Sequence, residues 1–299
     1  MGNQLSNQKG SDIYQQYNLV SREEVLSLGR YDTYTDSTTG KYFLVFESNY
    51  SITNPEMAES EITSLRKLDS IRNNCCLLTN SINKMQMMCF DNYAITLGFE
   101  YYNESFETAI KKTGPKIQLN EQDIWLIIND LINFLLELNN FGLNHGDLQP
   151  KNILFNKNQV AKVICPLIYT VYSNAYMLRI SNDDYRSTFS PELLENYQHR
   201  NISLNYDPIR SDIFSLGICL LSYIIKESYE IFYDFKANTI NFDNIKSHLS
   251  ELIKKGYSEE LFYFLNLCLK ESFYDRATLD ILLKIINTHK QNTRSQYWQ

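Results

Sequence analysis

The fold of this 299-residue chain is decided by residues 144–155, which read Asn-His-Gly-Asp-Leu-Gln-Pro-Lys-Asn-Ile-Leu-Phe. Two segments with helical patterns flank this stretch. Residues 121–140 repeat apolar side chains at three-four spacing and end at Phe141-Gly142, which predicts an amphipathic helix. Residues 211–225 are apolar on every side, which is typical of a helix at the centre of a core. We therefore place the stretch within a helical region of the chain.

The pattern is different in the first third of the chain. From about Ser21 to Tyr102, short runs rich in aromatic and β-branched residues, such as 41–47 and 93–97, predict strands. One helix is expected among them, with Asn54 as its N-cap and Pro55 at its first position. From Glu104 onward the pattern becomes helical, and two more helices are predicted at 261–270 and 278–288. The sequence thus predicts a small β-rich part followed by a larger helical part.

Residues 144–155 resemble the catalytic loop of eukaryotic protein kinases, H-R-D-L-x-x-x-N, with His145, Asp147, Leu148 and Asn152 in register. Other kinase landmarks follow in the expected order: Ser190-Pro191-Glu192 is similar to the A-P-E element, Asp212 to the aspartate of the central helix, and Arg276 to a late arginine. The resemblance covers roughly residues 20 to 290. It implies an α+β, bilobal fold, with a small β-rich N-lobe that contains one main helix and a larger α-helical C-lobe. The implied boundaries are a flexible tail at 1–20, the N-lobe at 21–101, the C-lobe at 102–290 and a tail at 291–299.

The resemblance also implies roles for individual residues. Asp147 matches the catalytic base of a kinase, and Asn152 matches a residue that holds a metal ion. Structural roles are implied for His145, for Asp212, which would hold the backbone of the catalytic loop, and for Arg276, which would pair with Glu192. In the small lobe, Glu61 matches the helix glutamate that orients a lysine. The nucleotide-binding hinge is matched by Glu100, Tyr101 and Tyr102.

Several groups that handle nucleotide in kinases are absent at the matching positions. Phosphoryl transfer depends on positioned charge, yet Phe46 matches the lysine of the third strand, so Glu61 has no evident partner. The position of the D-F-G aspartate, thirteen residues after Asn152, holds Cys165, and magnesium prefers oxygen ligands to sulfur. Gln149 replaces a lysine near the transferred phosphate. Tyr31 and Tyr34 match two glycines of the loop that covers the nucleotide, where their side chains would crowd the phosphates.

These replacements predict a pseudokinase, a protein-binding or regulatory module that needs no cofactor. Each lost contact to transition-state charge costs on the order of 3 kcal/mol, so their joint loss should reduce turnover to background. Gly146 replaces the arginine that pairs with a phosphorylated activation segment, which predicts that this switch is absent.

Two other functions are open at this point. One is an atypical active Ser/Thr kinase that uses ATP and magnesium, with Asp147 as base, a cation from Lys41 or Arg30, and a metal ligand from Asp183 or Asp184. The other is a small-molecule kinase of the aminoglycoside or choline type, whose loops also read H-G-D-L-x-P-x-N. Those enzymes lack elements like Ser190-Pro191-Glu192 and Asp212, which counts against this alternative.

The net charge and the first six residues indicate which classes of partner, nucleic acid or membrane, the chain is suited to bind. With 28 Lys+Arg against 35 Asp+Glu the net charge is −7, which disfavours nucleic acid. Residues 1–6 fit the N-myristoylation pattern at Gly2, and one acyl chain gives weak, reversible membrane binding. We therefore expect a cytoplasmic protein, peripheral on a membrane through its acyl chain, whose partner is a protein of unknown identity. The opening residues also resemble those of class III phosphatidylinositol 3-kinase regulatory subunits, which implies a membrane-tethered scaffold.

Overall fold

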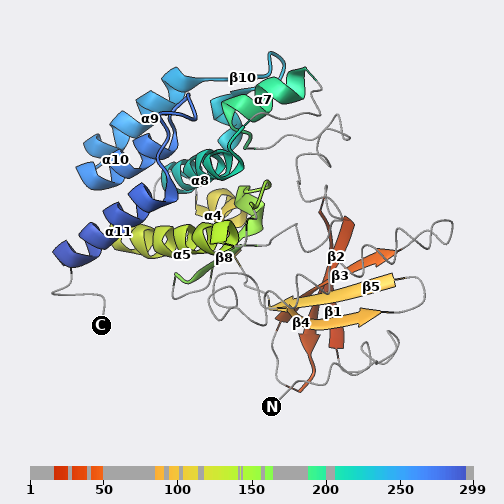
Figure 1. Ribbon diagram of the computed structural model, residues 1–299. Coiled ribbons are helices and arrows are strands. Elements are labelled where there is room, and N and C mark those ends of the chain that lie inside the picture. Colours follow the sequence, from red (N-terminus) through yellow and green to blue (C-terminus); the bar gives the residue numbers. More distant parts are fainter. Residues whose placement is uncertain are drawn as a thin grey trace. The chain divides into compact units, whose positions relative to one another are not determined.

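The computed structural model describes residues 17–25, 29–38, 42–49, 85–90, 94–100, 104–113, 118–140, 142, 144–155, 159–163, 188–199 and 206–293. The chain divides into two compact units, one of residues 1–103 with 166–173 and one of residues 104–165 with 174–299. The first contains an antiparallel sheet and the second is mainly helical, as Figure 1 shows. This is the α+β fold that the sequence predicted.

The first unit contains a five-stranded sheet with strand order β1-β2-β3-β5-β4. Every neighbouring pair is antiparallel. The strands are β1 (Tyr17–Val25), β2 (Gly29–Asp36), β3 (Tyr42–Asn49), β4 (Met85–Phe90) and β5 (Ala94–Glu100). β3 is rich in aromatic and β-branched residues, which suit a strand with neighbours on both sides. It lies between β2 and β5, at the centre of the sheet.

The strand register corrects two expectations. β1 begins at Tyr17, opposite Asp36, so the sheet includes residues 17–20, which were assigned to the flexible tail. Residues 17–19 pair with β2 through their backbone, which makes them part of the sheet. Tyr31 and Tyr34 lie inside β2, opposite Glu23 and Leu19, and the β1–β2 connection falls at residues 26–28, outside the described residues. The helix expected after Pro55 also lies outside the described residues.

The second unit is built from helices and two small sheets. Its helices are α4 (Phe106–Thr113), α5 (Glu121–Asn140), α7 (Pro191–Gln198), α8 (Pro208–Ile225), α9 (Phe242–Lys254), α10 (Glu259–Cys268) and α11 (Leu279–Thr293), with 3-10 turns η1 (Pro150–Asn152) and η3 (Tyr229–Phe232). One sheet has the order β6-β7-β8, formed by β6 (Glu104–Ser105), β7 (Ile153–Phe155) and β8 (Ala161–Val163). The other is a hairpin of β9 (Tyr233–Asp234) and β10 (Thr239–Ile240).

α8 forms the centre of the helical unit. All of its residues from Ser211 to Ile225 are buried, which explains its apolar surface on every side. By length and hydropathy α8 is the one described helix that could cross a membrane, but 83% of it is buried, as in the core helix of a folded domain. It begins three residues before the predicted start, because the Asp207 side chain caps it and Pro208 occupies its first turn.

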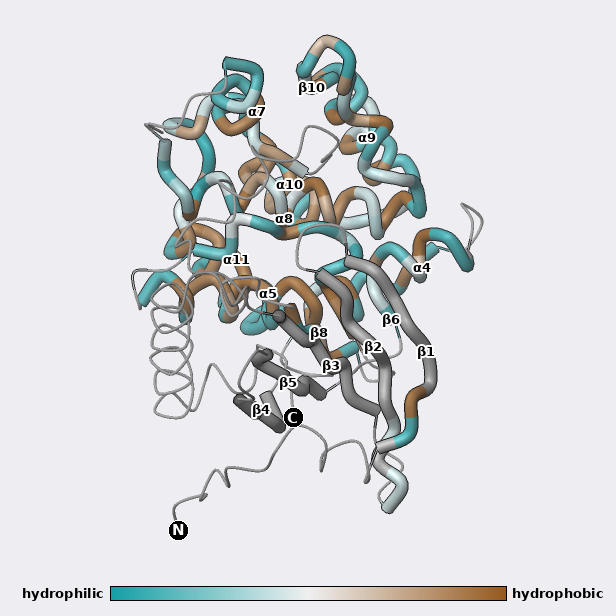
Figure 2. The backbone as a smooth tube through the Cα atoms, turned by 90° about the vertical axis from the view of Figure 1, so that its right-hand side faces the viewer, coloured by the Kyte–Doolittle hydropathy of each residue, from teal (hydrophilic) through white to brown (hydrophobic). Residues whose placement is uncertain are grey.

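The surrounding helices complete the core, with hydrophobic residues concentrated along α5, α8 and α10 (Figure 2). α5 has the predicted bounds, whereas α10 begins two residues before its predicted start. α11 continues to Thr293, so helix replaces the first residues of the tail expected at 291–299. Gly217 allows α8 to approach α10, since a Cβ added there would lie 2.9 Å from Cys268 Cβ. Cys219 and Cys268 are both fully buried in the core of the helical unit.

Candidate functional site

The loop that carries Asp147 runs from the end of α5 to η1 and β7. Gly146 adopts φ 71°, a left-handed backbone conformation that costs other residues about 1–2 kcal/mol. Glycine at this position therefore suits the local backbone. β7 pairs with both β6 and β8, which fixes the C-terminal end of the loop.

The N-terminal end of the loop is held by the central helix. Asp212 of α8 accepts hydrogen bonds from His145 N at 2.6 Å, through Oδ2, and from Gly146 N at 2.8 Å, through Oδ1. The carboxylate is buried, so these two charge-assisted bonds replace its hydration. The structure thus places Asp212 where the kinase resemblance implied, against the backbone of the loop.

His145 supports the loop from inside. Its Nδ1 accepts a hydrogen bond from Asp147 N at 3.0 Å, which requires this ring nitrogen to carry no proton. The ring is buried and packs edge-on against Phe134 of α5, with 5.7 Å between centroids. His145 thus contacts the backbone of Asp147 on one side and the Phe134 ring on the other.

Asp147 itself faces two carboxamide groups. Gln149 Nε2 donates to its Oδ1, and Asn152 Nδ2 lies 3.2 Å from its Oδ2 and 2.8 Å from its backbone oxygen. Asp147, Gln149 and Asn152 are each only 2% exposed. Both carboxylate oxygens thus accept hydrogen bonds from neutral donors of the same loop.

A cation, Lys151, lies in the same stretch of the chain, and Glu107 on another element is one of the charges that act on it. Lys151 belongs to η1, and burial lowers the pKa of its ammonium group, an effect that the charge of Glu107 on α4 partly offsets. Gln149 occupies the position expected to carry the family's lysine. Lys151 and Gln149 therefore have different surroundings although one residue separates them.

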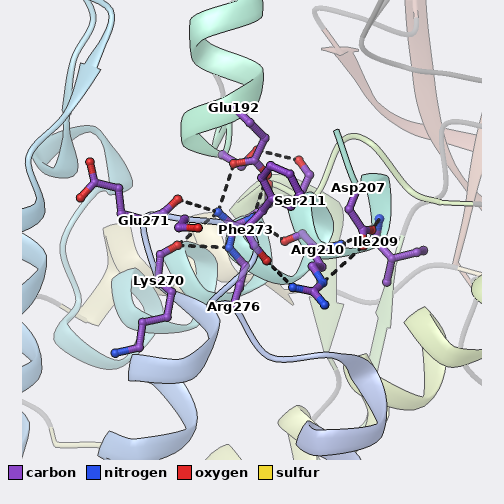
Figure 3. Close-up of polar contacts among 12 residues, drawn as sticks. Glu192, Asp207, Ile209, Arg210, Ser211, Lys270, Glu271, Phe273 and Arg276 are labelled. Carbon is purple, nitrogen blue, oxygen red and sulfur yellow. Dashed lines mark hydrogen bonds and ion pairs between the residues drawn. The ribbon is translucent and has the colours of Figure 1, made fainter. Parts of the chain in front are cut away.

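The second cluster of predicted residues lies at the beginning of α8. Arg276 Nη1 and Nη2 lie 2.8 and 3.1 Å from the Oε1 and Oε2 atoms of Glu192 on α7. The guanidinium group also donates to the backbone oxygens of Arg210, Lys270 and Glu271 (Figure 3). The Arg276 side chain is fully buried and that of Glu192 is 10% exposed, so this bidentate pair connects α7, α8 and the segment after α10 largely away from solvent.

Arg210 is a neighbour of this cluster that the sequence analysis did not identify. Its Nε lies 3.3 Å from Asp207 Oδ2, and its Nη1 donates to the backbone oxygens of Phe273 and Tyr274. Asp207 also accepts from the backbone nitrogens of Ile209 and Arg210. The sequence did contain a signal for this cap, because Asp207 directly precedes Pro208.

The structure therefore brings His145, Asp147, Asn152 and Asp212 together in one place, and Glu192 and Arg276 in another. Phe46 and Glu100 belong to β3 and β5 of the separate sheet unit, where Phe46 lies opposite Tyr31 and Leu97 and Glu100 lies opposite Phe43. The other predicted positions, Gly2, Glu61, Tyr101, Tyr102 and Cys165, lie outside the described residues. Within the described residues, no group of three or more His, Cys, Asp or Glu side chains could hold a metal ion.

Comparisons with known proteins agree with this geometry. A family model described as "Protein kinase domain" matches residues 39–288. A probable serine/threonine-protein kinase of Dictyostelium discoideum is 24% identical over 115 residues. That match covers 37% of this chain and 8% of the relative, so the chain spans a small part of the relative's length.

Proposed function

The chain belongs to the protein kinase family, and from that membership we propose a pseudokinase, which keeps the kinase scaffold without transferring phosphate. In this proposal its function is to bind a protein partner as a scaffold or regulatory module. The proposal separates two sets of residues. One set holds the fold together, and the other would have to handle a nucleotide.

The observation that carries the proposal is the surroundings of Asp147. Phosphoryl transfer develops negative charge that cations must stabilise. In this chain, the side chain two positions after Asp147 is the neutral Gln149, and its amide donates to the Asp147 carboxylate. A carboxylate that accepts hydrogen bonds on both oxygens from its own loop is less available to accept a proton from a substrate hydroxyl. Loss of one such charge contact costs on the order of 3 kcal/mol of transition-state stabilisation.

The central strand of the sheet supports the same proposal. In the family, a lysine on the third strand holds the phosphates. β3 reads Tyr-Phe-Leu-Val-Phe-Glu-Ser-Asn from Tyr42 to Asn49, and it contains neither lysine nor arginine. Its position between β2 and β5 identifies it as the third strand.

The residues at the metal-binding positions do not fit magnesium well. A protein kinase domain normally works with ATP and Mg²⁺, and Mg²⁺ prefers oxygen ligands in near-octahedral geometry. Asn152 could supply an amide oxygen, but Cys165 stands where the family has a carboxylate ligand. A thiol is a poor ligand for this hard cation. We therefore assign no step to a metal ion and propose that no cofactor is required.

The scaffold supports a binding role. The ion pair of Arg276 with Glu192 and the hydrogen bonds of Asp212 with the loop hold the helical unit together. Tyr263 and Tyr274 are 52% and 78% exposed, and tyrosine is enriched in protein interfaces.

The proposal includes a cytoplasmic location and reversible membrane contact through acylation of Gly2, which mass spectrometry of the N-terminal peptide tests.

A second candidate function, an atypical Ser/Thr kinase, is favoured by one specific observation. Asp147 and Asn152 are both retained, and the Asn152 amide holds the Asp147 backbone oxygen at 2.8 Å. This orders the two positions that a kinase needs for its base and for one metal ligand. The name of the Dictyostelium relative, a probable serine/threonine-protein kinase, is consistent with this candidate.

One experiment separates the two functions. Transfer of the γ-phosphate from ATP to the chain itself and to a pool of Ser- and Thr-containing peptides is measured with Mg²⁺ and with Mn²⁺. Asp147→Asn is the matched control, since it keeps the size of the side chain and removes its charge. We expect wild type and Asp147→Asn to incorporate the same background amount of phosphate. Incorporation that depends on Asp147 would favour the kinase.

A further inference from the structure

Glu121, in the first turn of α5, holds the beginning of α10 through its carboxylate. Its Oε2 accepts a hydrogen bond from Ser258 N at 2.8 Å, and its Oε1 accepts one from the Ser258 hydroxyl. Oε1 also accepts from Trp125 Nε1 at 3.1 Å. Ser258 is 137 positions away in the sequence, so one residue gives its two hydrogen-bond donors to one distant carboxylate.

The Ser258 hydroxyl is also the N-cap of α10, where its oxygen accepts a hydrogen bond from Leu261 N at 3.1 Å. The hydroxyl therefore accepts within its own helix and donates to another. An ionised carboxylate has no proton to give, so the hydroxyl contact with Glu121 exists only while the Ser258 oxygen carries one. This proton makes the contact between α5 and α10 sensitive to any chemistry that removes it.

Ser258 lies near the surface, in an acidic stretch of the chain. It is half-buried, and residues 253–256 just before it are exposed. Its backbone is extended, with φ −66° and ψ 152°. Glu259 and Glu260 follow it in the first turn of α10. Protein kinases select their substrates by patterns of charge, and two carboxylates directly after a serine suit an acid-directed enzyme.

A phosphate on Ser258 would turn this attraction into repulsion. It carries a charge of about −1.5 to −2 at neutral pH and has no hydrogen-bond donor for Glu121. Like charges would then face each other where the serine hydroxyl had donated a hydrogen bond. The N-terminal end of α10 favours negative charge, but Glu259 and Glu260 already supply it. We therefore expect repulsion to dominate.

We propose that Ser258 is a phosphorylation site whose modification releases the beginning of α10 from Glu121 of α5. The phosphate donor is ATP, and the enzyme is a Ser/Thr protein kinase that selects acidic residues after the serine. The Ser258 oxygen bonds to the γ-phosphorus, the bond from that phosphorus to the bridging oxygen breaks, ADP leaves, and the hydroxyl proton goes to the base of that kinase. The proposal goes beyond the pseudokinase function and does not depend on it, because the phosphate comes from another enzyme.

Phosphorylation in vitro tests the proposal on the full chain. The substrate carries Asp147→Asn, so that the incorporated phosphate comes from the added acid-directed kinase and ATP–Mg²⁺. We expect mass spectrometry to locate phosphate on Ser258 and the melting temperature to fall by about 4 °C or more. In a chain that also carries Ser258→Ala, the same treatment should leave the melting temperature unchanged. A chain without phosphate on Ser258, or one phosphorylated there with an unchanged melting temperature, would overturn the proposal.

A charge exchange at the contact isolates the repulsion. Ser258→Asp introduces one negative charge, and we expect it to lower the melting temperature by about 4 °C. With Glu121→Gln in the same chain the loss should be less than about 1 °C, because the amide donates to the new carboxylate and the like charge is gone. Ser258→Asn, of equal size and without charge, should fold even where Ser258→Asp does not. An equal loss with and without Glu121→Gln, or a failure of Ser258→Asn to fold, would contradict the proposal.

Ser228 is the matched control serine. It caps η3 by accepting from Glu230 N at 3.4 Å, and among the described residues no carboxylate accepts a hydrogen bond from its hydroxyl. Ser228→Asp should therefore change the melting temperature by less than about 1 °C. A loss as large as that in Ser258→Asp would show that any negative charge at a cap has this effect, which would overturn the role of Glu121.

Discussion

Glu192 and Asp147 are both carboxylates of the helical unit, and their surroundings differ in one respect. Glu192 binds the guanidinium group of Arg276 through two hydrogen bonds, of 2.8 and 3.1 Å. Asp147 binds the carboxamides of Gln149 and Asn152. The first carboxylate has a full positive charge beside it, and the second has neutral donors from its own loop. An ion pair thus holds the helices together at Glu192, whereas the hydrogen bonds from Gln149 and Asn152 to Asp147 come from uncharged groups.

The difference has a physical consequence for mutation. A buried ion pair contributes little net stability, but removing one partner leaves an uncompensated charge in the core. Gln149 is an uncharged partner of Asp147, so removing its amide leaves no uncompensated charge where the amide stood. Substitutions at Arg276 should therefore affect folding, whereas substitutions at Gln149 should affect only the local chemistry of the loop.

The largest expected effect is that of Arg276→Met. It removes the fully buried guanidinium and leaves Glu192 without its counter-charge, which should lower the free energy of unfolding by about 3–5 kcal/mol. Urea unfolding followed by circular dichroism measures this change. Arg210→Met is the control, since that side chain is 24% exposed and should lose only about 1 kcal/mol. Equal losses of unfolding free energy in the two variants would contradict the special role of the ion pair between Arg276 and Glu192.

Asp212→Asn should have the next largest effect. The amide keeps one oxygen, so only one of the nitrogens of His145 and Gly146 retains its acceptor. We expect a loss of about 2 kcal/mol in unfolding free energy, as for a hydrogen bond to a buried charge. Asp243→Asn, at a side chain that is 99% exposed, should change nothing measurable. An unchanged unfolding free energy in Asp212→Asn would show that α8 does not hold the loop.

Gln149→Lys places a cation beside Asp147, so this carboxylate would then have a charged neighbour as Glu192 does. We expect the unfolding free energy to change by less than about 1 kcal/mol, because the cost of burying the ammonium roughly offsets its attraction to the carboxylate. Phosphate transfer should stay at background, because β3 still has no lysine and Cys165 is unchanged. The double variant with Asp147→Asn is the control. Transfer that appears in Gln149→Lys and vanishes in the double variant would contradict this account.

The smallest expected effect concerns Lys226, a buried cation whose ammonium lies 4.0 Å from the centroid of the Tyr223 ring. Lys226 ends α8 with φ 62°, which glycine tolerates better, and burial lowers the pKa of Lys226 to about 8. Lys226→Gly should therefore raise the unfolding free energy by about 1 kcal/mol near neutral pH.

The pH dependence of this variant follows from the direction of the shift. Between about pH 8 and the ordinary lysine pKa of 10.5, the unfolded wild type binds more protons than the folded one, so its stability rises with pH. The advantage of Lys226→Gly should shrink over that range. Asn238→Gly changes another residue of positive φ, 53°, without removing a charge, and its effect should not vary with pH. Urea unfolding at both ends of the range measures this, and a constant advantage of Lys226→Gly would contradict the role of the charge.

Much of the helical unit could be predicted because its signals are local. The apolar spacing of residues 121–140 gave the bounds of α5, and the uniformly apolar 211–225 identified the buried α8. The kinase motifs indicated the places of Asp212, Glu192 and Arg276, because each belongs to a short pattern that follows the loop in the order typical of the family. The hairpin of β9 and β10 was missed, since each strand has two residues and no readable alternation.

Other contacts could not be predicted because they depend on packing between distant segments. The hydrogen bonds from Ser215 to Thr188 O and from Tyr233 to Phe189 O join residues 27 and 44 positions apart, and neither contact belongs to a sequence motif. The hydrogen bond from Gln149 to Asp147 depends on side-chain orientation within one loop, which sequence spacing does not specify. The start of β1 at Tyr17 depends on backbone pairing with β2, a contact between segments that the short run of residues 17–20 does not specify by itself.

The central claim is that this chain keeps the scaffold of a kinase without the groups that bind a nucleotide, and a thermal shift with ATP tests it most directly. A ligand that binds only the folded state raises the melting temperature in proportion to its affinity and concentration. The account predicts a change of less than about 1 °C with millimolar ATP and Mg²⁺. A rise of several degrees that requires Mg²⁺ would contradict it.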